Sequence, residues 1–311
     1  MQPHDPKYRR TLHPRQMRVG NVECPKMPVW SSISRKSARQ NTRYSKNAKQ
    51  QRKSCEFQQT PKGTGLSNHE SQHPIAPSRR GEPTNHGFFV TGTDTGVGKT
   101  LVSCALLYGF AALGKSVIGM KPVACGVVRG ATGLVNEDVA LLRAAGNVEA
   151  PLSLVNPYCF EPPIAPHLAA EQAGVTIDLT HIAQVFERLA AAADVVVVEG
   201  VGGFCVPLNH SEDSAELAQY LGLPVILVVG MRLGCLNHAL LTAHAIRARG
   251  LRLAGWIANR IDPAMEVAER NVAALAERMA GPLLGVIEFA TAPDPRRVAV
   301  QLALPNLAKS A

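Results

Sequence analysis

Short, fully apolar runs recur from Gly87 onward and constrain the fold more than any other feature of the sequence. Val195 to Val198 is the clearest, because a strand with one face in water would alternate apolar and polar residues. The runs predict strands at 87–92, 116–123, 194–200, 224–230, 251–259 and 282–287, separated by helices at 98–113, 137–145, 178–192, 213–220, 235–249 and 263–280. We therefore expect one α/β domain over 86–311 with three layers, a mostly parallel sheet between two layers of helices.

Residues 1–85 differ sharply in composition from the rest. They contain 17 Lys or Arg and 5 Asp or Glu, a net charge of +12, whereas residues 86–311 contain 16 basic and 19 acidic residues. Only 8 of the 85 are Leu, Ile, Val or Phe, which is too little apolar surface to offset the entropy of ordering the segment. We expect a disordered basic extension. Three interpretations compete: an arm that binds nucleic acid or an anionic surface, a targeting peptide, or an extension without a function of its own. The basic runs are short and no apolar signal segment is present, which favours the third interpretation.

Cysteine usage and hydropathy indicate where the protein works. The seven cysteines are scattered without a CxxC pair, which is typical of a reducing compartment and argues against a disulfide framework or a zinc site. No apolar run approaches the roughly 20 residues that span a membrane. We therefore expect a cytoplasmic protein that contacts neither membrane nor nucleic acid.

The first predicted strand runs into TGTDTGVGKT, and a helix follows at once. Glycines at 92, 96 and 98 let main-chain amides approach a phosphate, and the positive end of the helix adds to them. Lys99 supplies a charge to the terminal phosphates, and Thr100 supplies a hydroxyl to magnesium. A flexible turn is the alternative, although each misplaced glycine would cost about 0.5–1 kcal/mol. The first glycine lies one position earlier than the usual pattern places it, but the context predicts a P-loop.

Two carboxylates are candidates for the magnesium side of this site. Glu199 ends the strand 194–200, where nucleotide-binding enzymes of this class place a metal-side acid. The glycines that follow it leave the backbone free to approach a phosphate. Asp138 opens the helix 137–145, where a charge that only complements the helix dipole is an equal alternative.

Several blocks now make the pattern specific. They resemble, in order and spacing, the signature blocks of dethiobiotin synthetases and cover nearly all of 87–287: GTDTGVGKT, KPVACG, NEDVALL, NPYCFEPPIAPH, VEGVGG, PVILVVGMRLGCLNHALLTA and LAGWIAN. The resemblance implies an ATP- and Mg²⁺-dependent ligase of biotin biosynthesis. Such an enzyme carboxylates 7,8-diaminononanoate (diaminopelargonate) with CO2, activates the carbamate with the γ-phosphate of ATP and closes the ring of dethiobiotin.

The resemblance also implies residue roles. Lys99 and Lys121 would be catalytic, with Lys121 neutralising the carbamate and the transferring phosphoryl group. Thr100, Asp138 and Glu199 would hold Mg²⁺. The implied ATP-binding residues are Gly96, Val97, Gly98, Lys99, Thr100, Leu101, Asp138, Glu199, Gly200, Val201, Gly202, Asn259 and Arg260. The implied substrate-binding residues are Thr95, Lys121, Cys125, Leu233, Gly234 and Asn237.

Two of these assignments carry further consequences. The amides around Gly234 to Asn237 would bind the tail carboxylate of a substrate held by the neighbouring subunit, so a homodimer is implied. Asn259 would contact adenine, and a turn residue at a strand end is its alternative.

Three positions depart from the family pattern or stay open. Cys125 stands where Ser or Thr is usual, and a thiol is a weaker hydrogen-bond donor. Glu288 stands where Pro is expected after the last strand. His167 either borders the substrate or is an ordinary loop residue.

Two other functions share this fold. An ATP-switch protein of the partition or septum-placing type would carry an extra lysine early in the loop, but no basic residue lies between Arg80 and Lys99. An amidating synthetase of cobalamin assembly would need a fused glutaminase, for which a chain ending at 311 leaves no room.

Overall fold

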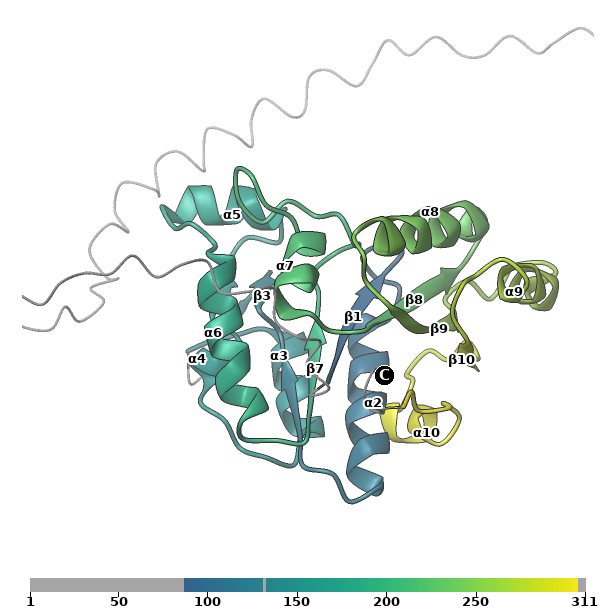
Figure 1. Cartoon of the computed structure of the whole chain (residues 1–311), viewed down its shortest axis with the longest axis horizontal. Helices are drawn as coiled ribbons and strands as arrows, with labels where there is room; N and C mark the ends of the chain where they lie inside the picture. Colours follow the sequence, from purple (N-terminus) through teal and green to yellow (C-terminus); the bar gives the residue numbers. More distant parts are fainter. Residues whose placement is uncertain (1–86, 131–132, 307–311) are drawn as a thin grey trace, which may run out of the picture. The chain divides into compact units, whose positions relative to one another are not determined.

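A six-stranded sheet forms the centre of the protein (Figure 1). The computed structural model describes residues 87–130 and 133–306, and the basic extension predicted at 1–85 lies outside them. All paired strands of the sheet are parallel. In spatial order they are β10 (Leu283–Ile287), β9 (Leu253–Arg260), β8 (Val225–Met231), β1 (Gly87–Gly92), β7 (Val195–Glu199) and β2 (Val117–Met120). A strand forms within each of the six predicted ranges, and the parallel arrangement is confirmed.

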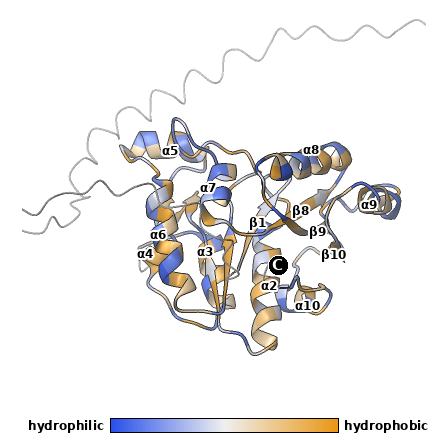
Figure 2. Cartoon of the chain, in the orientation of Figure 1, coloured by the Kyte–Doolittle hydropathy of each residue, from blue (hydrophilic) through white to orange (hydrophobic). Residues whose placement is uncertain are grey.

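Helices cover both faces of the sheet, as a sequence of fully apolar strands requires. Phe88 and Val90 of β1 face one apolar cluster and Phe89 faces the other, so successive residues of one strand serve two cores. On the first face lie α2 (Lys99–Ala112), α3 (Glu137–Ala145) and α10 (Pro295–Ala299). On the second lie α6 (Leu179–Ala190), α7 (Ser214–Leu221), α8 (Cys235–Ala248) and α9 (Ala268–Ala276). Figure 2 shows the hydrophobic strands between these mixed-polarity helices.

The strand predicted at 116–123 is interrupted. It leaves the central sheet after Met120, and β3 (Val123–Cys125) instead pairs in parallel with β6 (Tyr158–Phe160). Pro122 has no N–H to donate to a sheet, and the backbone N–H of Lys121 donates to the Val155 carbonyl at 2.8 Å. This break directs Lys121 away from the sheet, at its carboxyl edge.

Several smaller elements have no counterpart in the predicted set. They are β6, α10, α4 (Leu152–Val155), α5 (Pro166–Ala173) and an antiparallel pair of β4 (Val128–Gly130) with β5 (Gly133–Val135). The helix predicted at 263–280 begins only at Ala268. Asp262 accepts backbone N–H bonds from Ala264 and Met265, so a turn occupies the first positions of that range.

Candidate active site

The loop between β1 and α2 requires glycine. Gly96 and Gly98 have φ angles of 74° and 94°, in the left-handed region that L side chains rarely adopt. A Cβ on Gly98 would clash with Nδ2 of Asn259, at the end of β9. That amide donates to the Val97 carbonyl at 2.8 Å, so β9 supports the loop. The loop therefore leads directly into the start of α2, where helix amides and the positive helix end are available to a phosphate.

Four side chains from different segments meet beside this loop, and we call them the charged cluster: Thr100, Lys121, Asp138 and Glu199. Thr100 Oγ1 lies 2.9 Å from Oδ1 of Asp138 and 2.9 Å from Oε1 of Glu199. Lys121 Nζ donates to Oδ2 of Asp138 at 3.0 Å and to Oε1 of Glu199 at 2.5 Å. The carboxyl ends of β2 and β7, with the starts of α2 and α3, therefore bring these residues together, as expected for an open parallel sheet.

The charged cluster keeps Lys121 protonated. Its side chain is 5% exposed, and burial alone would lower its pKa, but the Glu199 and Asp138 carboxylates outweigh that effect and raise the pKa above its ordinary value. Burial would raise the pKa of Asp138, but Lys121, Thr100 and Lys99 together lower it. The cluster thus contains a fixed cation between acidic groups.

Lys99 has the opposite electrostatic environment. Burial, and then repulsion from Lys121, lowers its pKa from 10.5 to about 8. Its Nζ donates to the backbone carbonyl of Asp94 at 2.9 Å. Two amino groups thus lie at one edge of the sheet, and the pKa of Lys99 is low mainly because the side chain is buried and further because Lys121 repels its charged form. An anion beside them would relieve that repulsion.

Two asparagines that the sequence interpretation missed position the cluster. Asn156 donates through Nδ2 to the carbonyl of Lys121 at 2.7 Å. Asn136 precedes α3, accepts from Val139 N at 3.2 Å and donates to the Cys125 carbonyl at 3.3 Å. The N-cap preference of Asn before an acidic helix start is the only local signal for Asn136. Nothing local identifies Asn156, whose partner lies 35 positions away.

The cluster has the donor set that a magnesium ion prefers. Oε2 of Glu199 is buried and has no hydrogen-bond partner among the described residues. A buried carboxylate oxygen without a partner is costly unless a cation satisfies it. Two carboxylates and a hydroxyl suit Mg²⁺, which takes few protein ligands and keeps sites for water and phosphate. Within the described part of the chain no three His, Cys, Asp or Glu groups converge as a metal cage.

The segment predicted to bind the substrate lies at the start of α8. Gly234 is the N-cap of α8 with φ 93°, and Leu233 beside it is 96% exposed. No hydrogen bond among the described residues joins Leu233, Gly234 or Asn237 to Lys121. Arg232, just before this segment, instead donates a hydrogen bond to Asp94 of the β1–α2 loop.

Several other predicted residues lie in the β1–α2 loop, in the segment after β7 or in the adjoining elements. Gly200 N donates to Val90 O at 2.9 Å, and the Cβ position of Gly202 is 3.7 Å from Oγ1 of Thr95, so the segment after β7 packs beside the β1–α2 loop. Leu101 and Val201 are half-buried next to these residues.

Burial raises the pKa of the half-buried Cys125 thiol, which keeps it neutral.

Arg260, predicted to contact ATP, is paired with two carboxylates. Its Nη1 donates to Oε1 of Glu269 at 3.0 Å and to Oε2 of Glu288 at 2.8 Å. Glu288 therefore pairs with Arg260 at the position where Pro was expected after the last strand. His167 lies in the first turn of α5 with a buried Nδ1 that no described residue contacts by a hydrogen bond.

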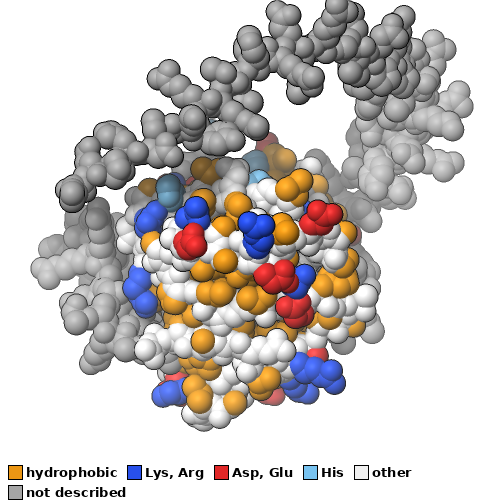
Figure 3. All heavy atoms as spheres, turned by 90° about the vertical axis from the view of Figure 1, so that its right-hand side faces the viewer, with side chains coloured by type: hydrophobic (Ala, Val, Ile, Leu, Met, Phe, Trp, Pro, Cys, Tyr) orange, Lys and Arg blue, Asp and Glu red, His pale blue; other side chains and the backbone are white. Residues whose placement is uncertain are grey.

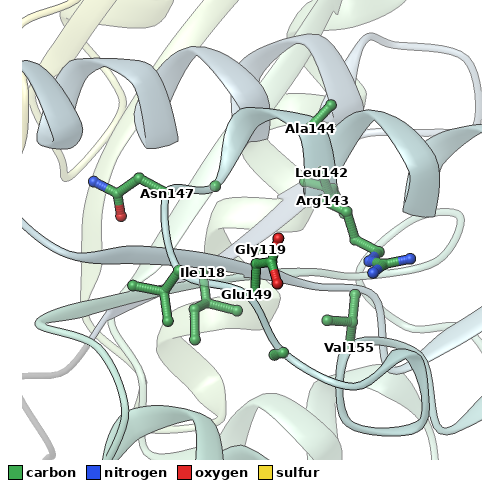
Figure 4. A pocket seen from close by; sticks show the side chains of 11 residues that line it. Ile118, Gly119, Leu142, Arg143, Ala144, Asn147, Glu149 and Val155 are labelled. Atoms are coloured by element: carbon green, nitrogen blue, oxygen red, sulfur yellow. The ribbon is translucent and has the colours of Figure 1, made fainter.

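A cavity of about 400 Å³ lies elsewhere, between β2, the end of α3 with the segment that follows it, and the end of α4 (Figure 4). Its lining includes the polar side chains of Arg143, Asn147 and Glu149 and the apolar side chains of Ile118, Leu142 and Val155. The charged cluster uses Asp138, at the other end of α3. The cavity is thus separate from the convergent polar groups, and its lining contains none of the predicted site residues.

The exposed surface carries both signs of charge. On the face shown in Figure 3, basic and acidic side chains are interspersed among hydrophobic ones, so that face offers no continuous basic surface. Among residues 87–130 and 133–306, no helix is long and apolar enough to cross a membrane. The five cysteines in these ranges are all free thiols.

Similarity to known proteins identifies the family of this chain. The sequence model of AAA_26, an AAA domain, matches residues 86–296. The ATP-dependent dethiobiotin synthetase BioD of Nitrosospira multiformis is 56% identical over 224 residues, 72% of this chain and 97% of that protein. The BioD of Aromatoleum aromaticum is 57% identical over 219 residues, 70% of this chain and 97% of that protein.

The BioD of Ralstonia nicotianae is 52% identical over 217 residues, 70% of this chain and 95% of that protein. Among solved structures, the septum site-determining protein MinD of Pyrococcus horikoshii, complexed with Mg-ADP, is 18% identical over 65% of this chain and 81% of that chain, with a TM-score of 0.43. At more than half identity over nearly the full length of three relatives, the chain belongs to the ATP-dependent dethiobiotin synthetase family.

Proposed function

We propose that the charged cluster and Lys99 form the active site of this ATP-dependent dethiobiotin synthetase, a ligase of biotin biosynthesis. One amine of 7,8-diaminononanoate adds to CO2 and loses a proton, which gives a carbamate. A carbamate oxygen attacks the γ-phosphorus of ATP, and ADP leaves. The second amine then attacks the carbonyl carbon of this carbamic-phosphoric anhydride and loses a proton, phosphate leaves with the bridging oxygen, and the ureido ring of dethiobiotin closes. The observation that carries the assignment is Lys121, a buried cation between two carboxylates beside a phosphate-binding loop.

Lys121 suits the anionic centre of this reaction. The substrate amines are the nucleophiles, so no protein Ser or Cys has to attack. The protein instead has to hold a carbamate next to a triphosphate and stabilise the charge that both carry. Because the pKa of Lys121 is raised, this side chain is an ammonium throughout the physiological pH range. We assign it the carbamate and the transferring phosphoryl group.

Thr100, Asp138 and Glu199 are the proposed Mg²⁺ ligands. Bound there, the ion would supply charge neutralisation for the β- and γ-phosphates. The unpartnered Oε2 of Glu199 supports the assignment. Glu199 and Asp138 also hold Lys121 in the same cluster, so the acid pair positions the catalytic cation as well as the metal.

The amides at the start of α8 are the proposed site for the tail carboxylate. Gly234 leaves the N–H groups of the first turn of α8 without a side-chain cap, and such groups bind anions. The exposed Leu233 and Leu241, 96% and 60% accessible, support a contact with a second subunit that completes the site in a homodimer. The free thiols of the described cysteines support a cytoplasmic location.

ATP affinity is expected to depend on pH through Lys99. In the free protein its pKa is about 8, and phosphate oxygens beside it would raise that pKa. Below pH 8 the lysine is already protonated and binding takes up no proton. Above pH 8 the free lysine is neutral and must gain a proton when ATP binds, so affinity falls with rising pH, by up to about tenfold per unit.

Calorimetric titration of Mg-ATP between pH 6.5 and 9.5 would measure this dependence. Lys99→Met is the matched control, because it removes the titrating group and should bind weakly with a flat profile over the same range. A wild-type affinity that stays constant up to pH 9.5 would contradict the assigned role of Lys99.

The proposed reaction is tested by its product. The purified protein is incubated with ATP, Mg²⁺, bicarbonate and 7,8-diaminononanoate, and dethiobiotin is detected by mass. We expect one phosphate released per dethiobiotin, and release that requires the diamine. ATP hydrolysis at an equal rate without the diamine would refute the proposed function.

A further inference from the structure

Asp94 joins two segments that the proposed function assigns to different ligands. It lies in the β1–α2 loop, where its backbone carbonyl accepts from Lys99 Nζ at 2.9 Å and its Oδ1 accepts from Thr95 N at 2.7 Å. Its Oδ2 accepts from Nη2 of Arg232, 138 positions away in the sequence. A single residue thus contacts the phosphate-binding lysine, the loop backbone and the segment that precedes α8.

Arg232 is held in the turn that precedes α8. Its carbonyl accepts from Cys235 N at 3.0 Å, which closes the turn containing Leu233 and Gly234 at the start of α8. Its guanidinium extends from that turn to the carboxylate of Asp94. The ion pair therefore fixes the position of the anion-binding turn relative to the phosphate-binding loop, which the two neighbouring strands β1 and β8 already bring close.

The charge state of the pair supports this contact. The Thr95 backbone N–H holds the pKa of Asp94 below its ordinary value against a smaller opposing effect of burial, and Arg232 and His238 lower it further. Asp94 is therefore a carboxylate at neutral pH. Both side chains are about half-exposed, 47% for Asp94 and 42% for Arg232, and exposed pairs of this kind contribute little to folding stability. The protein is expected to fold without the pair, which lets its role in binding be measured.

We propose that Asp94 and Arg232 are a positioning pair that couples the binding of ATP to the binding of the acid substrate. The inference rests on the proposed function, because it takes the β1–α2 loop as the phosphate site and the turn before α8 as the carboxylate site. Coupling of this kind is reciprocal: ATP raises the affinity for the acid by the same factor as the acid raises the affinity for ATP. In the proposed homodimer the turn serves the neighbouring subunit, so the pair would also connect the two active sites.

Calorimetry without bicarbonate measures the coupling without turnover. The Kd of 7,8-diaminononanoate is determined with and without a saturating non-hydrolysable ATP analogue and Mg²⁺. We expect the analogue to tighten binding about tenfold in the wild type, within the usual range of coupling factors. Asp94→Asn and Arg232→Met should each reduce the factor to below about twofold, and the double variant should match either single variant, because one interaction is lost in all three.

Two further variants separate positioning from a general effect. Arg232→Lys keeps a cation at the turn and should retain part of the coupling. Arg249→Met removes another partly exposed arginine, which follows the end of α8 and pairs with Asp213 and Glu216 at the start of α7. This variant should keep the wild-type coupling factor. Circular dichroism verifies that each variant is folded.

The proposal is wrong if both single variants keep a tenfold factor, if the double variant loses more than either, or if Arg249→Met loses the coupling too. It is also wrong if the wild type has none. Failure of the proposed function is a separate result, since it appears as absence of dethiobiotin in the product assay with the wild-type protein.

Discussion

Replacing Lys121 with alanine is expected to lower kcat for dethiobiotin formation by about 100- to 1,000-fold. Loss of one preorganised group that stabilises developing negative charge typically has an effect of this size. Lys121 Nζ lies within 3.0 Å of both acids of the cluster, and its raised pKa keeps it charged at the assay pH. Phosphate release in the presence of the diamine and bicarbonate measures the effect.

The same substitution also removes a partner from a buried carboxylate. Glu199 is 1% exposed, and leaving a buried charge unpaired costs about 3–5 kcal/mol of folding free energy. The double variant Lys121→Met with Glu199→Gln removes both charges, so it should regain melting temperature without regaining activity. Lys115→Ala is the matched control, because this exposed lysine lies just before the amino end of β2. A folded Lys121→Ala protein with near wild-type kcat would show that Lys121 does not act in the reaction.

Gly98→Ala is expected to raise the Kd for Mg-ATP by at least about 100-fold. A φ of 94° costs an L residue roughly 1–3 kcal/mol, and the new Cβ would also clash with Nδ2 of Asn259. The loop has to move to relieve that clash, and its amides then no longer surround a phosphate. Since a factor of ten corresponds to about 1.4 kcal/mol, the expected loss is about 2.8 kcal/mol of binding free energy.

Gly222→Ala supplies the matched control for this substitution. Gly222 ends α7 with φ 62°, and a Cβ there meets no atom within 4 Å. It carries backbone strain of the same kind but lies outside the phosphate site, so the variant should lose stability and keep its ATP affinity. Titration calorimetry on both variants decides the matter, and an unchanged Kd in Gly98→Ala would contradict the role given to the loop.

The sequence was sufficient for the elements whose signals are local. An apolar run such as Val195 to Val198 identifies a strand buried on both faces, and the glycine spacing before Lys99 identifies a phosphate-binding loop, without knowledge of distant residues. All six central strands follow from such runs. The break after Met120 was missed although Pro122 is a local signal for it, because the new path of the chain depends on the bond from the Lys121 backbone to Val155, which lies far along the sequence.

The side-chain network of the site depends on contacts that no local pattern encodes. Thr100, Asp138 and Glu199 were predicted as one group from the resemblance, and the fold brings them within hydrogen-bonding distance. Their roles as metal ligands stay a prediction. That Lys121 lies between the two acids, that Asn156 positions it and that Asp94 pairs with Arg232 all depend on tertiary packing. Asn259 was predicted to contact adenine, whereas its amide nitrogen bonds to Val97, and a contact with adenine also stays a prediction.

A crystal structure with Mg²⁺, a non-hydrolysable ATP analogue and 7,8-diaminononanoate would show whether one site holds nucleotide, metal and carbamate precursor together. We expect Lys99 to contact the terminal phosphates and Lys121 to lie between the γ-phosphate and the nearer amine. Three side chains should surround the ion: Thr100, Asp138 and Glu199. A triphosphate bound away from these five side chains, or a diamine bound out of reach of Lys121, would contradict it.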